Sequence, residues 1–239
     1  MKLGYRILKE DDILEESFGP IQITVWHKGY KDIEKTLGLT TSLKNRGIEF
    51  VIHPAGLYMS ETRPEARDGY LSALIEYAKM TDMGLIIHDE TRPDGKRLDG
   101  IWRDAYKEGL KILEEICKVS VENAFDSFNA VWFWSEFANS ITFDIGHFES
   151  AGMDVFRVIE ELDKKQLQKI DYIHAHRNNG PHWGSVTDHW PLTEDCREVE
   201  ALLRLLELKE DIKVIVEVDS SDLKQSFEAL SSRLDKVSI

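Results

Sequence analysis

Several patterns are scarce or missing in this chain of 239 residues, and each scarcity excludes a class of protein. The two cysteines, Cys117 and Cys196, lie in predicted helices without the spacing of metal ligands, so we expect reduced thiols and neither a disulfide nor a cysteine zinc site. No apolar run is long enough to span a bilayer, and the first residues, MKLGYRILKEDD, lack the apolar segment of a secretory signal peptide. We therefore expect a cytoplasmic protein with no membrane partner.

Basic residues are outnumbered, because 30 Lys and Arg stand against 44 Asp and Glu, which gives a net charge of −14. Such a field repels phosphate backbones, so we expect no nucleic-acid partner unless bound metals reverse the sign locally. No glycine-rich phosphate loop follows a predicted strand, and we expect no organic cofactor. Neither a linker nor a low-complexity segment divides the sequence, so we expect a single domain over residues 1–239.

What the chain does contain is a series of short apolar runs separated by helical or loop-helix segments. Continuously apolar runs are typical of parallel strands that are covered on both faces, and the alternation predicts βα units. Eight such units fit a single closed (β/α)8 TIM barrel, with an open doubly wound sheet as the alternative. The predicted strands are Leu3–Leu8, Ile21–His27, Glu49–His53, Met83–His88, Val119–Glu122, Ile141–Asp144, Ile170–His174 and Ile212–Glu217.

Ionisable residues gather at the ends of these strands. All eight histidines lie at a strand end or in the loop after it, and in a barrel these ends converge at one mouth. Glu122, Asp144 and Glu217 each end an apolar strand, where a charge costs several kcal/mol unless it is paired or binds a metal. Together with His174 they form a mixed oxygen and nitrogen set that suits Mn²⁺, Mg²⁺, Co²⁺ or Zn²⁺. We therefore expect one divalent metal at this site.

Purely structural interpretations remain open for these residues. A strand-end glutamate can cap the next helix or pair with a lysine. A lone strand-end histidine needs only one hydrogen bond, an interpretation that we favour for His27 and His176 and leave open for His53 and His88. The DxxH spacing of Asp144 and His147 is harder to explain structurally, because it aims both side chains at the mouth. Tryptophans could shield a substrate or simply pack in loops and helices, and the candidates are Trp132, Trp134, Trp183 and Trp190.

Six strand-end motifs in this order resemble the xylose isomerase-like barrel superfamily, which includes sugar isomerases and epimerases, inosose dehydratases and the endonuclease IV group. The resemblance runs from roughly Ile21 to Val218. Each motif alone is weak, and the six together are specific for the superfamily rather than for one activity. The motifs are FVIHPAG, GLIIHDE, VSVENAF, ITFDIGH, DYIHAHRNNG with DHWPL after it, and VIVEVD.

The resemblance implies roles for individual residues. The single-metal epimerase site of the superfamily matches Glu122, Asp144, His174 and Glu217. His147 matches a histidine that contacts either the substrate or the metal ligands. In the endonuclease branch, His53 and His88 match ligands of additional zinc ions. This chain departs from both patterns: Asp188 and His189 are adjacent where that branch has Asp-x-His, and Arg177 stands where isomerases often have Asp.

These observations predict a metal-dependent isomerase or epimerase of a small sugar, polyol or hydroxy acid. Glu122 and Glu217 would exchange protons on opposite faces of the substrate while the metal stabilises an enediolate. Arg177 would bind an anionic group of the substrate. The resemblance also implies that a homo-oligomer is possible. The alternatives are a multi-zinc phosphodiesterase of the endonuclease IV type and a non-catalytic barrel that binds a metal or a ligand.

Overall fold

The computed structural model describes residues 2–14, 19–124, 128–178 and 189–234. Each of its eight strands pairs in parallel with the next, and β1 pairs with β8, which closes the barrel. The predicted (β/α)8 barrel is therefore confirmed, and the open sheet is wrong. The strands are β1 (Lys2–Ile7), β2 (Ile21–Trp26), β3 (Phe50–Ala55), β4 (Leu85–His88), β5 (Val119–Glu122), β6 (Ile141–Asp144), β7 (Ile170–Ala175) and β8 (Lys213–Val216).

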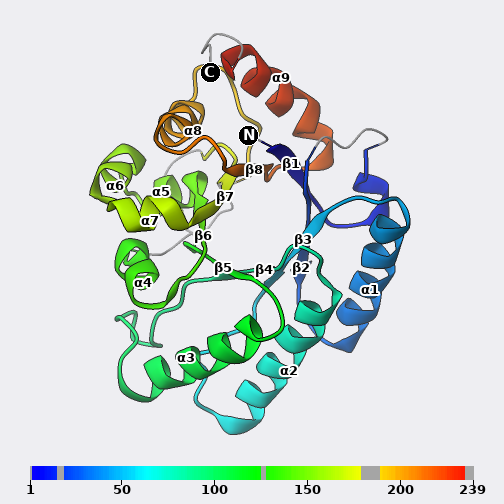
Figure 1. The fold of residues 1–239 in the computed structure, drawn as a ribbon, viewed down its shortest axis with the longest axis vertical. Helices are drawn as coiled ribbons and strands as arrows, with labels where there is room; N and C mark the ends of the chain where they lie inside the picture. The colour runs from blue at the N-terminus through cyan, green and yellow to red at the C-terminus, as the bar shows by residue number, and fades with distance from the viewer. Residues whose placement is uncertain (1, 15–18, 125–127, 179–188, 235–239) are drawn as a thin grey trace.

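Helices surround the strands, as Figure 1 shows. Two of them, α5 and α7, have only six residues, and the pattern of apolar residues in the sequence does not predict them as separate helices. The α-helices are α1 (Tyr30–Asn45), α2 (Pro64–Met80), α3 (Gly100–Glu114), α4 (Ala130–Phe137), α5 (Ile145–Ser150), α6 (Val155–Glu161), α7 (Lys164–Lys169), α8 (Arg197–Leu208) and α9 (Leu223–Leu234). Two 3-10 helices, η1 (Glu10–Asp12) and η2 (Ser220–Asp222), complete the described elements.

Side chains that point into the barrel form layers, because successive residues of a strand face opposite sides. The lower layer contains a buried apolar cluster formed by Val51, Ile86, Tyr172 and Ile215. Two residues further along the same strands stand the side chains of His53, His88, His174 and Glu217. The strand period therefore places the ionisable layer directly above the apolar one, at the mouth of the barrel.

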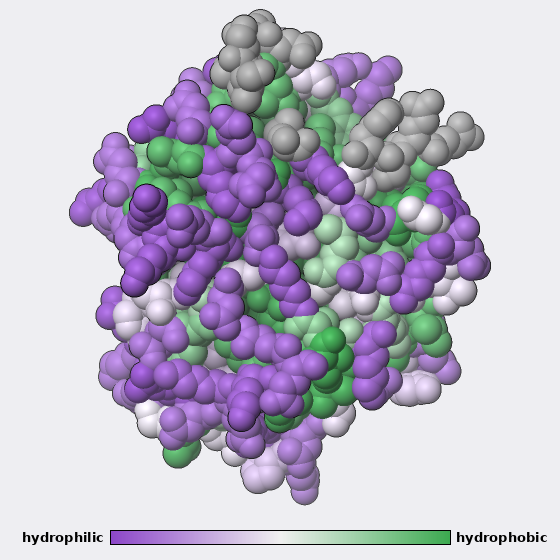
Figure 2. Space-filling view, viewed as in Figure 1, coloured by the Kyte–Doolittle hydropathy of each residue, from purple (hydrophilic) through white to green (hydrophobic). Residues whose placement is uncertain are grey.

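The outer core lies between the strands and the helices. Helix α8 is a representative case, since Val199, Leu202 and Leu206 are buried while Arg204 and Glu207 form an exposed ion pair. Burying each such apolar side chain contributes roughly 1.5–3 kcal/mol. Hydrophilic side chains cover most of the face shown in Figure 2. Among the described residues, no helix has both the length and the apolar character needed to cross a membrane.

Candidate metal centre

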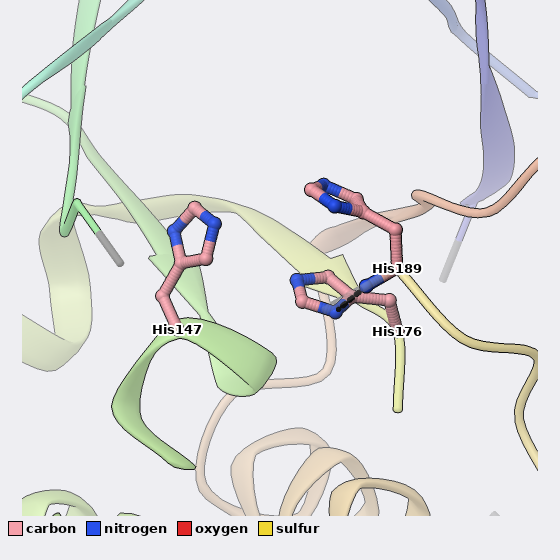
Figure 3. Close-up of side chains that lie close together, drawn as sticks. All are labelled: His147, His176 and His189. Atoms are coloured by element: carbon pink, nitrogen blue, oxygen red, sulfur yellow. Dashed lines mark hydrogen bonds between the residues drawn. The ribbon is translucent and has the colours of Figure 1, made fainter. Parts of the chain in front are cut away.

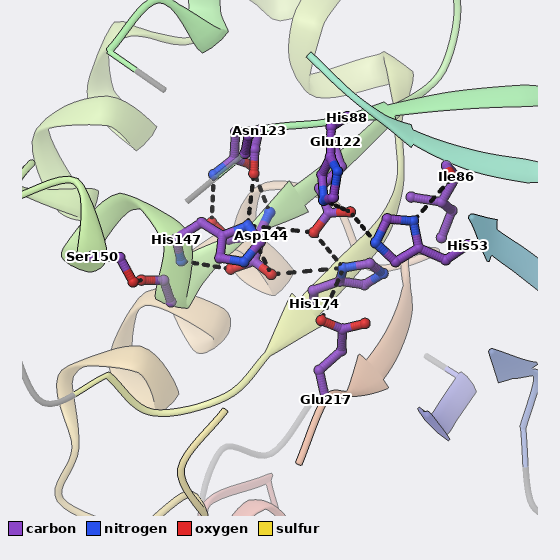
Figure 4. Close-up of polar contacts among 12 residues, drawn as sticks. His53, Ile86, His88, Glu122, Asn123, Asp144, His147, Ser150, His174 and Glu217 are labelled. Atoms are coloured by element: carbon purple, nitrogen blue, oxygen red, sulfur yellow. Dashed lines mark hydrogen bonds and ion pairs between the residues drawn. The ribbon is translucent and has the colours of Figure 1, made fainter. Parts of the chain in front are cut away.

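The upper layer brings together the four residues that the sequence proposed as metal ligands. Glu122, Asp144, His174 and Glu217 end or follow β5, β6, β7 and β8, and each offers a ligand atom within 4.8 Å of the others. His174 Nδ1 lies 2.8 Å from Glu122 Oε1, 3.7 Å from Asp144 Oδ2 and 3.6 Å from Glu217 Oε2. All four side chains are buried, and Figure 4 shows them converging. Three carboxylates and one imidazole around a point form a donor set suited to a divalent cation.

Glu122 stands between two groups of histidines. Its Oε1 contacts His174 and lies 3.5 Å from His147 Nδ1. Its Oε2 has no hydrogen-bond partner and instead lies 3.1 Å from His53 Nε2 and 3.5 Å from His88 Nε2. Ligand atoms around a tetrahedral metal with bonds of about 2.0 Å stand roughly 3.3 Å apart, so these separations fit coordination. The two oxygens of Glu122 could therefore serve two neighbouring metal positions.

The tautomer of His53 points to the same conclusion. Its Nδ1 lies 3.0 Å from the carbonyl oxygen of Ile86, so the ring proton belongs on Nδ1 and the lone pair lies on Nε2. That lone pair faces the oxygen of Glu122, which also accepts, so a proton or a cation is needed between them. Burial lowers the pKa of His53 to about 4 and raises the pKa of Glu122 to about 8. A neutral imidazole is the form that binds metals.

Asp144 is fixed by its position at the start of α5. Its Oδ1 accepts a hydrogen bond of 2.7 Å from the backbone N–H of His147, as an N-terminal cap. Asn123 clamps the same residue from β5: the Asn123 side chain accepts from the Asp144 N–H at 2.8 Å and donates to the Asp144 carbonyl at 2.9 Å. The carbonyl oxygen of Asn123 also lies 2.8 Å from His147 Nδ1. One asparagine thus orients both residues of the DxxH motif.

Charge compensation at the centre depends on His174. Burial lowers the pKa of His174, but the carboxylates of Glu122 and Glu217 outweigh that effect and hold it well above its usual value. The imidazolium would therefore occupy the place of a cation when none is bound. Glu217 is held by Gln22, whose amide donates to Oε1, and by His189, whose Nε2 lies 3.2 Å from Oε2. A divalent cation would displace the His174 proton on binding.

A third group of potential ligands consists of His147, His176 and His189, whose rings Figure 3 shows together. It lies beside the centre, because His147 approaches Glu122 and His176 approaches Asp144. The rings of His176 and His189 stack at 4.4 Å. His176 already uses both ring nitrogens: Nδ1 accepts from the His189 N–H at 3.0 Å, and Nε2 lies 3.1 Å from Asp144 Oδ1. His176 therefore contacts both Asp144 and His189, and as one of three clustered imidazoles it could also hold an ion.

Two backbone features hold His176 and His189 in place. A Cβ atom on Gly146 would stand 2.1 Å from Cε1 of His176, so only glycine lets the ring pack against the first turn of α5. His189 has a φ of 59°, in the left-handed region that costs a non-glycine residue roughly 1–2 kcal/mol. Among the described residues it is the only non-glycine residue with positive φ. Strain of this kind concentrates at functional sites.

Above the ligands lies a cavity of about 330 Å³. Its polar wall includes His53, His88, His147, His189 and Glu217, and its rim includes the half-exposed aromatic rings of Trp26 and Tyr58. Arg6 of β1 completes the wall and is only 8% exposed. A cavity of this size suits a molecule on the scale of a sugar.

Some side chains singled out from the sequence lie elsewhere. The guanidinium of Arg177 stacks over Trp190 with 5.6 Å to the ring centroid, and neither residue is among those that line the cavity. Trp134 is buried in the outer core against Phe143 and donates to the carbonyl of Val121, so it does not shield the site.

His27 contacts the hydroxyl of Tyr77 at 2.9 Å, as the structural interpretation predicts. The other tryptophan on α4, Trp132, packs against Phe133 and Phe137, and Asp188 and Trp183 lie outside the described residues.

Sequence reasoning missed Gln22, Asn123 and Arg6. A signal for Gln22 and Arg6 exists in the strand period: Arg6 pairs in register with Gln22, and polar residues at inward positions of β1 and β2 continue the ionisable layer around the ring. Asn123 directly follows the strand-end Glu122, where a short amide can reach back to the neighbouring strand. Gly146 is visible within the DxxH motif, but the ring that it accommodates belongs to His176, which directly follows β7.

The donors present fit a divalent metal. The supporting observations are a buried carboxylate oxygen without a hydrogen bond, a lone pair that faces it, and three carboxylates around one imidazole. Such a centre can bind vicinal oxygens of a substrate and place two glutamates beside it.

Comparison with known proteins identifies the fold. No family model and no curated protein sequence matches the chain. Among solved structures, endonuclease IV from Thermus thermophilus is similar, with a TM-score of 0.66, 15% identity and coverage of 99% of this chain and 100% of that one. A xylose isomerase domain containing protein from Salmonella typhimurium has a TM-score of 0.65 and 12% identity, with coverage of 89% of this chain and 87% of that one. The probable 3-DHS dehydratase from Bacillus anthracis has a TM-score of 0.65 and 14% identity, with coverage of 98% of this chain and 100% of that one. The chain therefore shares its barrel fold with these three structures, and its strand-end motifs predicted a fold of this kind.

Proposed function

We propose that this chain is a divalent-metal-dependent isomerase or epimerase of a small polyhydroxylated or hydroxy-acid substrate. The observation that carries the proposal is the convergence of Glu122, Asp144, His174 and Glu217, four buried donors within 4.8 Å of one another. These residues would hold the metal, which supplies Lewis-acid polarisation of a carbonyl and a neighbouring hydroxyl of the substrate.

The two glutamates would move the protons. They stand on β5 and directly after β8, so they flank Asp144 and His174, which come from the strands between them. Gln22 and His189 fix the Glu217 carboxylate, and a fixed carboxylate is what proton transfer at a defined carbon requires. His147 lines the cavity and would contact a substrate oxygen.

The dimensions of the mouth and the net charge of the chain favour a small molecule. The cavity measures about 330 Å³, and its rim carries the rings of Trp26 and Tyr58, which can stack on the apolar face of a sugar. The net charge of −14 disfavours long phosphate backbones.

A second candidate is hydrolysis of a phosphate ester, and one observation favours it. Oε2 of Glu122 faces His53 and His88, so a second metal could share this carboxylate with the first. Carboxylate-bridged pairs of metals are typical of phosphatases and nucleases.

Metal analysis and activity assays separate these candidates. One equivalent of Mn²⁺ or Co²⁺ in the purified protein, with turnover of ketoses, inososes or hydroxypyruvate, supports the isomerase. Two or three equivalents of zinc, with cleavage of bis(p-nitrophenyl) phosphate or of abasic DNA, support the hydrolase. Bound metal without turnover of either class leaves a non-catalytic barrel.

The variant Glu217→Gln tests the proton-transfer role. Its amide keeps the shape of the carboxylate, so the melting temperature should stay near that of the wild type while turnover falls by orders of magnitude. Wild-type turnover in this variant would contradict the assignment.

A further inference from the structure

Arg6 is an unusual residue for this mouth, because it introduces a positive charge into a layer of carboxylates and imidazoles. It pairs in register with Gln22, whose amide reaches Glu217, so both side chains point into the barrel. Arg6 lines the same cavity as Glu217, His53 and His189. A guanidinium in this place reaches the space in which a substrate would lie.

The bonding capacity of Arg6 is largely unused within the described part of the chain. Its one salt bridge there joins Nη2 to Asp219 Oδ1 at 3.6 Å, which is longer than a hydrogen bond, and Asp219 is 75% exposed. Ion pairs of this kind contribute little. A guanidinium has five N–H donors arranged to bind a carboxylate or a phosphate in two-pronged fashion. The barrel thus holds a nearly buried guanidinium whose only salt bridge to the described residues is the long one to Asp219.

Arg6 also belongs to a second space. A neighbouring hollow of about 360 Å³ is lined by Arg6, Lys9 and Lys35 together with two carboxylates, Asp12 and Asp219. In a chain of net charge −14, three basic side chains against two carboxylates leave a local excess of positive charge next to the negative metal centre. A substrate with an anionic end and a hydroxylated end would be oriented by this contrast.

We infer that Arg6 is the specificity-determining residue that binds the anionic group, carboxylate or phosphate, of the substrate. The hydroxylated end of the substrate then faces Glu122, Asp144, His174 and Glu217. This inference rests on the proposed function, since it names the substrate class of the same cavity. It also replaces Arg177, which stacks on Trp190 away from the cavity, as the anion-binding residue.

A competing explanation is that Arg6 only compensates the buried charge of Glu217. Removing Arg6 would then weaken metal binding or the fold without changing the choice between ligands. A change in ligand choice at constant metal content separates the two explanations.

The test is calorimetric titration of the Mn²⁺-loaded full-length protein with three ligands on one carbon skeleton: D-glucitol, D-gluconate and D-glucitol 6-phosphate. The wild type should bind one of the anions roughly tenfold or more tightly than glucitol, the gain expected of a charge-assisted hydrogen bond. Whichever anion is preferred identifies the group as carboxylate or phosphate. In Arg6→Met the preference should vanish, with glucitol affinity and metal content unchanged, and Arg6→Lys should retain part of it.

Asp219→Asn is the second variant, and it is informative even if Arg6→Met fails to fold. It removes the exposed partner of Arg6, so the anion preference should rise about twofold to threefold. Equal affinities in the wild type, absence of anion binding, a preference that survives in Arg6→Met, or a preference that falls in Asp219→Asn overturns the inference. Failure of the wild type to retain metal, measured before titration, instead overturns the proposed function.

Discussion

The two inner layers of the barrel stand on the same strands, two residues apart, and differ in almost every property. The lower layer contains the buried apolar cluster of Val51, Ile86, Tyr172 and Ile215, and its polar side chains Ser120 and Thr142 are neutral and hydrogen-bonded to each other. The upper layer consists of carboxylates and imidazoles, and three of them, Glu122, Asp144 and His174, are as fully buried as the apolar side chains below. Burying charges without a partner costs several kcal/mol each, whereas apolar burial stabilises the fold. The comparison teaches that this barrel separates stability and chemistry along its axis.

The largest effect should come from Glu122→Gln, because Glu122 contacts both groups of ligands. Metal affinity should fall on the order of 100-fold or more. The apoprotein should be about as stable as the wild type, because burial already raises the pKa of Glu122 to about 8 and the amide resembles the neutral acid in shape. Metal titration and thermal unfolding measure the two quantities.

Ser120→Ala is the matched control, since Ser120 lies two residues earlier on the same strand and hydrogen-bonds to Thr142. Its metal affinity should stay within a few-fold of the wild type. Equal losses of metal affinity in Ser120→Ala and Glu122→Gln would contradict the assignment of metal binding to the upper layer.

The next effect is the reverse one, in the lower layer. Ile215→Ala should lower the free energy of unfolding by roughly 2–5 kcal/mol, because Ile215 is fully buried and its truncation leaves a cavity. The number of metal equivalents should not change. Denaturant unfolding measures the first quantity and metal analysis the second. Loss of metal at unchanged stability would contradict the assignment of stability to the lower layer and metal binding to the upper one.

A smaller effect is expected for Gly146→Ala. The new Cβ would collide with the His176 ring, so the ring must leave Asp144 or α5 must shift, at a cost of about 1–3 kcal/mol. Histidine NMR signals report the displacement, and urea unfolding reports the cost.

Gly69→Ala supplies the control for a glycine in open space. Gly69 lies within α2, and a Cβ there meets nothing within 4 Å. Alanine favours a helix over glycine, so stability should rise by up to about 1 kcal/mol. A loss in Gly69→Ala as large as that in Gly146→Ala would argue against a specific clash.

The smallest effect concerns the far end of the barrel. Cys117 lies just before β5, at the end opposite the mouth, and burial raises the pKa of its thiol to about 11. A raised thiol pKa keeps the neutral, unreactive form until the pH approaches that value. In Cys196→Ser at pH 8.5, iodoacetamide should label Cys117 on the order of 100-fold more slowly than an ordinary thiol of pKa about 8.5. Mass spectrometry follows the labelling, and a rate equal to that in urea would contradict the shift.

The barrel was predictable because eight apolar runs are long enough to mark its strands, and β5 and β6 match their predicted bounds. The helices α5 and α7 escaped because six residues carry too little of the 3.6-residue period. The convergence of Glu122 and Glu217 at one mouth followed from strand direction alone. Arg6 and Arg177 were not distinguishable in this way: β1 is weakly marked, and the direction of a side chain after a strand depends on contacts such as the stacking on Trp190.

The ring is closed by pairing its first and last strands, with Tyr5 opposite Val216. Arg6 and Glu217, which follow these two residues, therefore meet only when nearly all of the described chain has been synthesised. A nascent chain that lacks β8 would expose the lateral edges of β1 and β7 and would hold only part of the ligand set. Binding of the proposed metal would thus be coupled to the last step of barrel assembly, the docking of β8.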